Sequence, residues 1–212
     1  GDPVPGGTNT EQYDGTSWSE VGDIPVARRA GMGGGISTAG LAAGGFSPNT
    51  AASDSSTTWN GTSWAAANDL NVAHAYAQGG GTTSPTGFVA SGESPPGAEI
   101  ANSESFDGTS WSAMADVTNA RASGMGAGSS TAAVIMGGTE PPPVATIGVK
   151  TEVYDGSAWA AAGDLATARG EAAGFGTQTS AVVAGGGPPT TTTTEEFSVP
   201  ATVSVAQEGQ VW

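Results

Sequence analysis

Short apolar segments of three or four residues recur along the chain, and each ends in small residues followed by a polar loop. Each is preceded by a segment rich in glycine and alanine, such as residues 30–35 and 122–126. Neither kind of segment shows a sustained helical period. The pattern predicts an all-β protein of many short strands, with the glycine-rich strands where backbones crowd together. The apolar segments are residues 41–43, 88–90, 133–136 and 181–184.

A six-residue phrase occurs four times: an aromatic residue, Asp or Asn, Gly, two small residues and Trp. The tryptophans that end the phrases are separated by 46, 47 and 48 residues. A period of this length is typical of stacked β units. We therefore expect four repeats in residues 1–197, at about 10–55, 56–102, 103–150 and 151–197. The repeat tryptophans are Trp18, Trp64, Trp111 and Trp159.

The Asp-Gly or Asn-Gly step inside each phrase supplies the positive φ that a tight hairpin turn requires. The aromatic residue before the turn and the Trp after it then lie on paired strands, where they pack as large apolar anchors between sheets. The preceding aromatics are Tyr13, Trp59, Phe106 and Tyr154.

One basic position recurs once in each repeat and is held by Arg in three repeats and by His in the other. We expect this cation to bond backbone carbonyls or a carboxylate between units, because three of only five Lys and Arg residues are used there. The residues at this basic position are Arg28, His74, Arg121 and Arg169.

The chain is strongly acidic, with a net charge of −15. Binding to nucleic acid or to an anionic membrane surface is disfavoured, because both require a basic patch. The absence of cysteine rules out disulfides and thiolate metal sites. No apolar stretch is long enough to span a bilayer, and no charged-then-apolar leader opens the sequence.

The sequence offers no convincing catalytic constellation. His74 is the only histidine and occupies the basic position, so a nucleophile–base pair is not expected. The glycines of residues 31–35 lack the Lys-Ser/Thr of a phosphate loop. Asp14, Asp107 and Asp155 recur as turn residues and not as a glycosidase pair. We therefore expect neither an enzyme nor a cofactor, although oxygen-rich turns leave calcium open.

These features resemble the kelch repeat: Glu-x-Tyr-Asp, then Trp, then Arg, then an apolar strand that ends in Gly-Gly. The resemblance covers about residues 10–197, with departures at Thr57 and Ser91. It implies a β-propeller of four four-stranded antiparallel blades. We expect the ring to be closed by the N- and C-terminal strands or to be completed by further sequence or a partner. In a ring closed by one chain, the strands through Trp18 would complete the blade begun by residues 171–185, leaving 198–212 as an added strand or exit linker.

The sequences of the repeats are also similar to those of kelch-like proteins of marine tailed viruses. This resemblance implies a structural or recognition module of a virion tail or appendage, whose partners are other virion proteins, a host surface or further copies of the same chain. The alternative is a secreted or cell-surface adhesin or lectin that binds glycans. In either case the candidate contacts are the loops that differ between repeats. These loops are residues 46–53, 93–102 and 139–150.

Overall fold

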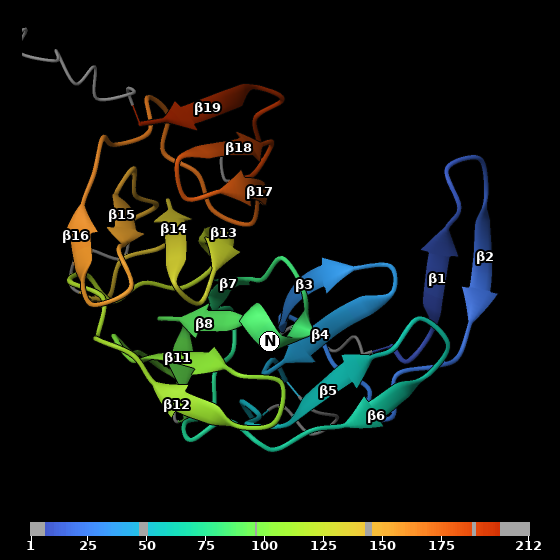
Figure 1. Cartoon of the computed structure of the whole chain (residues 1–212). Helices are drawn as coiled ribbons and strands as arrows, with labels where there is room; N and C mark the ends of the chain where they lie inside the picture. The colour runs from blue at the N-terminus through green and yellow to red at the C-terminus, as the bar shows by residue number, and fades with distance from the viewer. Residues whose placement is uncertain (1–6, 47–50, 96, 143–145, 188–189, 200–212) are drawn as a thin grey trace, which may run out of the picture.

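A computed structural model describes residues 7–46, 51–95, 97–142, 146–187 and 190–199 of the chain. The described residues form short strands and one 3₁₀ turn, as the sequence pattern predicts. Four antiparallel sheets, named blades 1 to 4 in chain order, follow one another around a common axis (Figure 1). This confirms the expected all-β propeller of four blades.

Each blade begins with the strand nearest the axis and proceeds outward. Blade 1 contains β3 (Met32–Ile36), β4 (Ala39–Ala43), β5 (Ser56–Trp59) and β6 (Trp64–Ala66). Blade 2 contains β7 (Gln78–Gly80), β8 (Phe88–Ala90), β11 (Ser103–Phe106) and β12 (Trp111–Ala113), with the 3₁₀ turn η1 (Ser84–Thr86) between its first two strands. A side hairpin of blade 2 is formed by β9 (Glu93–Ser94) and β10 (Ala98–Glu99).

The two later blades differ in their number of strands. Blade 3 contains β13 (Met125–Ser129), β14 (Ala132–Met136), β15 (Thr151–Tyr154) and β16 (Trp159–Ala161). Among the described residues, blade 4 contains three strands: β17 (Ala173–Thr177), β18 (Ser180–Ala184) and β19 (Thr194–Ser198). A separate two-stranded hairpin precedes blade 1 and contains β1 (Thr10–Tyr13) and β2 (Trp18–Val21).

The innermost strands contain small residues because they approach one another very closely at the axis. A Cβ atom on Gly34 would lie 2.7 Å from the carbonyl carbon of Gly80, and one on Gly126 would lie 2.5 Å from the carbonyl oxygen of Gly79. The four inner strands surround an axial cavity of about 480 Å³. The glycine-rich segments are therefore the crowded strands that the sequence predicts.

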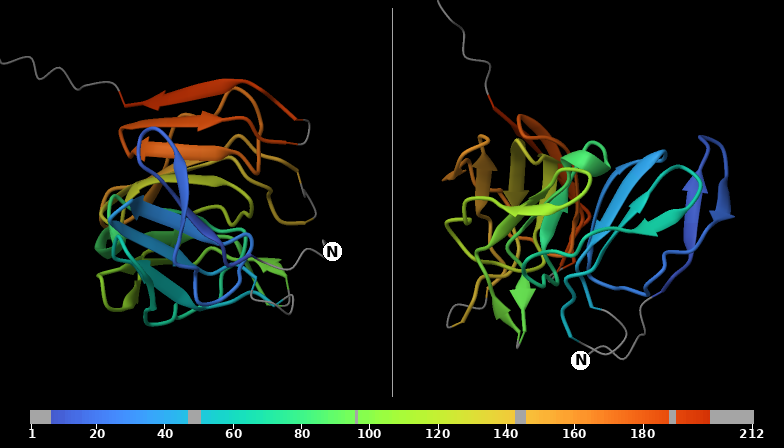
Figure 2. Two further views of the ribbon diagram at one scale, coloured as in Figure 1. Left: turned by 90° about the vertical axis from the view of Figure 1, so that its right-hand side faces the viewer. Right: turned by 60° about the horizontal axis from the view of Figure 1, so that its bottom comes forward.

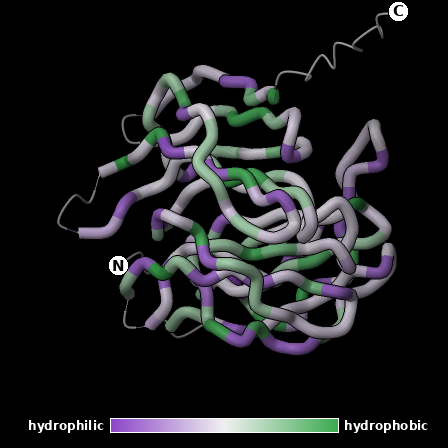
Figure 3. The backbone as a smooth tube through the Cα atoms, turned by 60° about the vertical axis from the view of Figure 1, so that its left-hand side comes forward, coloured by the Kyte–Doolittle hydropathy of each residue, from purple (hydrophilic) through white to green (hydrophobic). Residues whose placement is uncertain are grey.

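Hydrophobic cores lie between consecutive blades. Leu41 of blade 1 packs in one cluster with Phe106 and Trp111 of blade 2. Corresponding clusters join blade 2 to blade 3 and blade 3 to blade 4. Along the chain, hydrophobic stretches follow the packed strands and many hydrophilic residues lie on loops (Figure 3). A blade therefore buries its apolar side chains against its neighbours, which is why the repeats fold side by side.

Backbone hydrogen bonds also connect each blade to the next. Tyr76 N–H donates to the Ala30 carbonyl at 2.9 Å, Ser123 N–H to Tyr76 and Glu171 N–H to Ser123, both at 2.8 Å. All four residues have positive φ between 51° and 57° although none is glycine. Such conformations cost roughly 1–3 kcal/mol each, and the blade-to-blade bonds help to hold them.

Blade 4 is not completed by the N-terminal strands, as it would be in a ring closed by one chain. In such a ring the strands through Trp18 would complete the blade begun by residues 171–185. The structure instead pairs β18 with β19, with Ala184 opposite Thr194 and Ala181 opposite Phe197. The β1–β2 hairpin packs beside blade 1 at the other end of the arc (Figure 1). Residue 198 ends β19, and residues 200–212 of the expected linker lie outside the described residues.

Candidate recognition surface

The aromatic residue and the Trp of each phrase lie directly opposite each other across the predicted hairpin. Their ring centroids are 5.1 to 5.5 Å apart in all four repeats. Burial differs between the repeats: Trp111 and Trp159 are 6% and 5% exposed, whereas Trp18 is 66% exposed. Trp59, Phe106 and Tyr154 are buried, Trp64 is half-buried and Tyr13 is exposed. These aromatics therefore act as wedges between blades wherever a neighbouring blade covers them.

The turn between the two aromatics explains the recurring acidic residue. In each repeat, one side-chain oxygen accepts hydrogen bonds from the two N–H groups that follow the glycine. In the last repeat, the Ser157 hydroxyl and these backbone donors lower the pKa of Asp155 to about 2. The described residues contain no group of three or more His, Cys, Asp or Glu side chains placed to hold a metal ion.

The basic position forms a buried clamp inside each blade. The Arg121 guanidinium pairs with the Glu152 carboxylate and donates to the Lys150 carbonyl at 2.7 Å. Glu152 in turn accepts from the backbone N–H groups of Thr118 and Asn119 in the turn before the arginine. The carboxylate therefore fixes the start of blade 3 to its third strand. Arg169 makes the equivalent pair with Glu195 of β19.

Two substitutions within the clamp itself, His74 for the arginine in blade 2 and Thr57 for the acid in blade 1, change it. His74 is fully buried, bonds the Ser91 carbonyl through Nδ1 at 2.7 Å and lies 3.7 Å from Glu104 through Nε2. Burial opposes the ionisation of Glu104, but the His74 side chain and the N–H donors of the preceding turn outweigh it and lower the pKa of this carboxyl. In blade 1, Thr57 replaces the acid, and Arg28 donates to backbone carbonyls instead.

The described parts of the loops that differ between repeats lie on one face of the molecule, at the right of the left-hand view in Figure 2. We call this the loop face. Two of these loops meet there and enclose a pocket of about 290 Å³. The pocket is lined by Phe46, Ala51, Ala52, Glu93, Ser94, Pro95 and Gly97.

The walls of this pocket combine an aromatic ring with a carboxyl group. The Phe46 ring is held by the Arg29 guanidinium, 4.7 Å from its centroid, and by a T-shaped contact with the Tyr76 ring, with the ring centroids 5.3 Å apart. On the opposite loop, burial and the nearby Glu99 carboxylate raise the pKa of Glu93. The arrangement can pack against an apolar surface and hydrogen-bond a polar group beside it.

The sequence indicated the loops of this pocket but not the residues that support it. Arg29 follows the basic position directly and was not distinguished from it by the repeat pattern. Tyr76 lies in the bend before the first strand of blade 2, and its equivalents in the other blades are Ala30, Ser123 and Glu171. An aromatic residue at a position that is small or polar in the other repeats is the feature of the sequence that could have indicated its role beside the pocket.

Comparisons with known proteins agree with the fold. No protein-family model matches the sequence, and no curated protein is similar enough to count as a relative. The solved structure of YjhT is similar to this chain with a TM-score of 0.75 and 14% sequence identity. The similarity covers 92% of this chain and 74% of YjhT. It supports the β-propeller architecture. No helix in the described segments has the length and apolar character needed to cross a membrane.

Proposed function

We propose that this chain is a non-enzymatic structural and recognition module of an extracellular assembly, and that it contacts its partner through the loop face. The observation that carries the proposal is the pocket between the loop after β4 and the β9–β10 hairpin. Its walls belong to segments that differ between repeats, whereas the strands and turns beneath recur from blade to blade. A constant frame that presents variable loops is an arrangement suited to recognition.

The polar groups of the frame support the non-enzymatic part of the proposal. His74, the usual type of general base, is fully buried and bonds a backbone carbonyl. Glu104 and Glu152 are 2% and 1% exposed and accept bonds from the turns that they hold. These groups stabilise the blades and face no open space in which a substrate would react.

A virion appendage or tail-associated protein is the assembly that we favour. The wording of the repeats resembles that of tailed-virus proteins, and a net charge of −15 suits a protein exposed to solvent in a large particle. Its partners are then other virion proteins or a host-surface receptor, and neither nucleic acid nor a membrane surface. The location is the virion or the extracellular space.

Labelling of particles tests this assignment. Antibodies raised against the purified protein are applied to separated virus-particle and cell fractions from one culture of the natural source. We expect gold label on the tails or appendages of particles. Label restricted to cell surfaces would favour the adhesin alternative, and label restricted to the cell interior would contradict both.

The pocket itself favours a glycan as a second candidate ligand. The Phe46 ring offers a surface on which a sugar ring can stack, and Glu93 and Ser94 offer hydrogen-bonding groups beside it. A glycan array with the native protein tests this candidate. Binding that is lost in Ala52→Arg, which fills the pocket, and kept in Ala65→Arg on the exposed outer strand β6, would support it. Equal binding by both variants would place the ligand elsewhere, and no binding at all would reject it.

A further inference from the structure

The repeat tryptophans form a regular series of hydrogen bonds between successive units. Each indole N–H donates to the hydroxyl of the residue that begins the third strand of the unit before it. These bonds are Trp64 to Thr10 at 3.1 Å, Trp111 to Ser56 at 3.2 Å and Trp159 to Ser103 at 3.2 Å. The next acceptor in the series is Thr151, which begins β15.

No donor for this acceptor is found among the described residues. Thr151 is 1% exposed, and its Oγ1 has no hydrogen-bond partner among the described residues. A buried hydroxyl left without a partner costs about 1–3 kcal/mol. Trp18 is the repeat tryptophan left over: its ring is 66% exposed, and no bond from its Nε1 is found within the described part of the chain.

We infer that the β1–β2 hairpin of a second copy of this chain fills the outer half of blade 4, with Trp18 donating to Thr151 Oγ1. This interface goes beyond the proposed function, because it concerns how copies join and not what they bind. The hairpin takes the place that β19 occupies in the single chain. Glu11 then takes the position of Glu195 and pairs with the Arg169 guanidinium in its place.

The hairpin matches this place better than β19 does. Both begin with Thr-Glu, and both have an aromatic residue in the fourth position. The hairpin continues through the complete turn of residues 14–17 to a fourth strand and Trp18. β19 ends at Ser198, and in the described part of the chain no fourth strand pairs with it and Thr151 Oγ1 has no donor. Burying the Trp18 ring adds an aromatic surface of roughly 150–250 Å².

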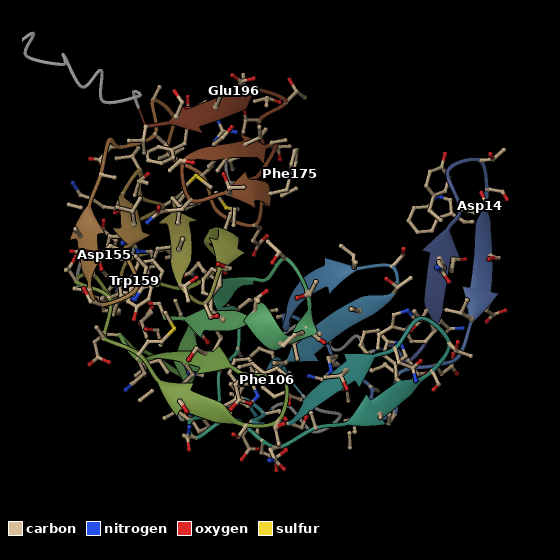
Figure 4. The ribbon with its side chains drawn as sticks, viewed as in Figure 1. Asp14, Phe106, Asp155, Trp159, Phe175 and Glu196 are labelled. Carbon is tan, nitrogen blue, oxygen red and sulfur yellow. The ribbon has the colours of Figure 1, made fainter. Side chains whose placement is uncertain are left out.

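The two ends of the arc also have complementary faces. Phe175 on β17 is 56% exposed on the side of blade 4 that faces away from blade 3 (Figure 4). On blade 1, a Cβ atom on Gly33 would meet nothing within 4 Å, although the next residue is crowded against blade 2. The exposed Phe175 ring on blade 4 of one copy can therefore pack in the open space beside Gly33 on blade 1 of the next copy.

A backbone bond that joins the other blades is also unformed at these ends. Gly45 N–H donates to the His74 carbonyl at 2.6 Å, Gly92 N–H to Arg121 at 2.7 Å and Gly138 N–H to Arg169 at 2.9 Å. The next pair in this series is Gly186 N–H and the Arg28 carbonyl, which do not bond each other in the described chain. Blade 4 of one copy against blade 1 of the next brings this pair together.

A second copy fits this place better than the chain's own hairpin. Within one chain, the hairpin and β19 lie at opposite ends of the arc (Figure 1). Bringing them together requires the inner strands to close further around the axis. The glycine contacts at Gly34 and Gly126 show that the inner strands of blades 1 and 2, and of blades 2 and 3, already approach as closely as their backbones permit. Because the two contacting surfaces differ, the contact is head-to-tail, and its repetition closes a ring or extends a filament.

Disulfide trapping between separate chains tests this interface, since the native sequence has no cysteine. In the pairing of β18 with β19, Val182 faces Glu196, so our arrangement places Gln12 opposite Val182. Chains that carry Gln12→Cys are mixed with chains of different mass that carry Val182→Cys, and then oxidised. We expect a mixed disulfide and, for the native protein, a light-scattering mass of two chains or more.

Two controls keep the result specific. Val183→Cys lies on the opposite face of β18 and is expected to give no mixed product with Gln12→Cys. Trp18→Ala removes an exposed side chain, so we expect the single chain to fold and the assembly to be lost. The inference is wrong if the native protein has the mass of one chain and no mixed disulfide forms. It is also wrong if a chain that carries both Gln12→Cys and Val182→Cys forms the disulfide only within itself, because the hairpin then fills its own blade.

Discussion

Truncating Trp111 and Trp18 compares how much stability is lost when a repeat tryptophan is buried between blades and when it is exposed. Trp111→Ala removes a ring that is 6% exposed, packs in the cluster between blades 1 and 2 and donates to Ser56 Oγ. Large-to-small changes of buried aromatics cost about 3–5 kcal/mol. Trp18→Ala removes a ring of the same repeat position that is 66% exposed. Since only a third of its surface is covered, we expect a loss of about 1 kcal/mol or less.

Thermal unfolding measured by circular dichroism compares the two variants. In a chain of this size, 1 kcal/mol shifts the midpoint by about 2–4 °C, so Trp111→Ala is expected to lower it by about 6–20 °C. The shift for Trp18→Ala is expected to stay under about 4 °C at protein concentrations where light scattering reports single chains. Equal shifts in the two variants would refute the placement of Trp111 between blades.

Three further perturbations test the clamp, the turn and the crowded axis. Glu152→Ala leaves the buried Arg121 without its carboxylate and is expected to cost about 3–5 kcal/mol in chemical denaturation; a loss under about 1 kcal/mol would contradict the clamp. The pKa of Asp155 is lowered from 3.8 to about 2. Its contribution to stability is therefore complete above pH 3.8 and lost as pH falls towards 2, so Asp155→Asn is expected to flatten stability across that window, and an NMR titration midpoint near 3.8 would argue against it. Gly126→Ala forces a Cβ to 2.5 Å from a backbone oxygen of blade 2 and is expected to lower the melting midpoint, whereas Gly163→Ala, with open space around it, is expected to leave it nearly unchanged; similar midpoints for the two would argue against the crowded axis.

Local chemistry made most of the fold predictable from the sequence. The Asp-Gly step specifies a two-stranded turn, so the pairing of Tyr154 with Trp159 follows from spacing alone. The runs of glycine predict close backbone approach because no side chain is available to separate the strands. The four-blade architecture follows from these two features and their period.

The remaining features depend on contacts between distant segments. The repeat pattern placed Arg121 and Glu152 in register, but only the fold shows that they meet inside one blade and also hold a turn. The choice of β19 over the hairpin for blade 4 was not predictable, because both segments offer nearly the same strand sequence. The pocket at Phe46 and Glu93 requires two loops of unrelated sequence to meet, which no local pattern encodes.

The rate of hydrogen exchange at the indole N–H groups tests the central claim most directly. The claim is that tryptophan wedges hold successive blades together. In a protein labelled with ¹⁵N-tryptophan, the buried, hydrogen-bonded indoles of Trp111 and Trp159 are expected to exchange slowly, and that of Trp18 rapidly in single chains. Fast exchange at all of these indoles would show that the rings face water and that the blades are not joined in this way.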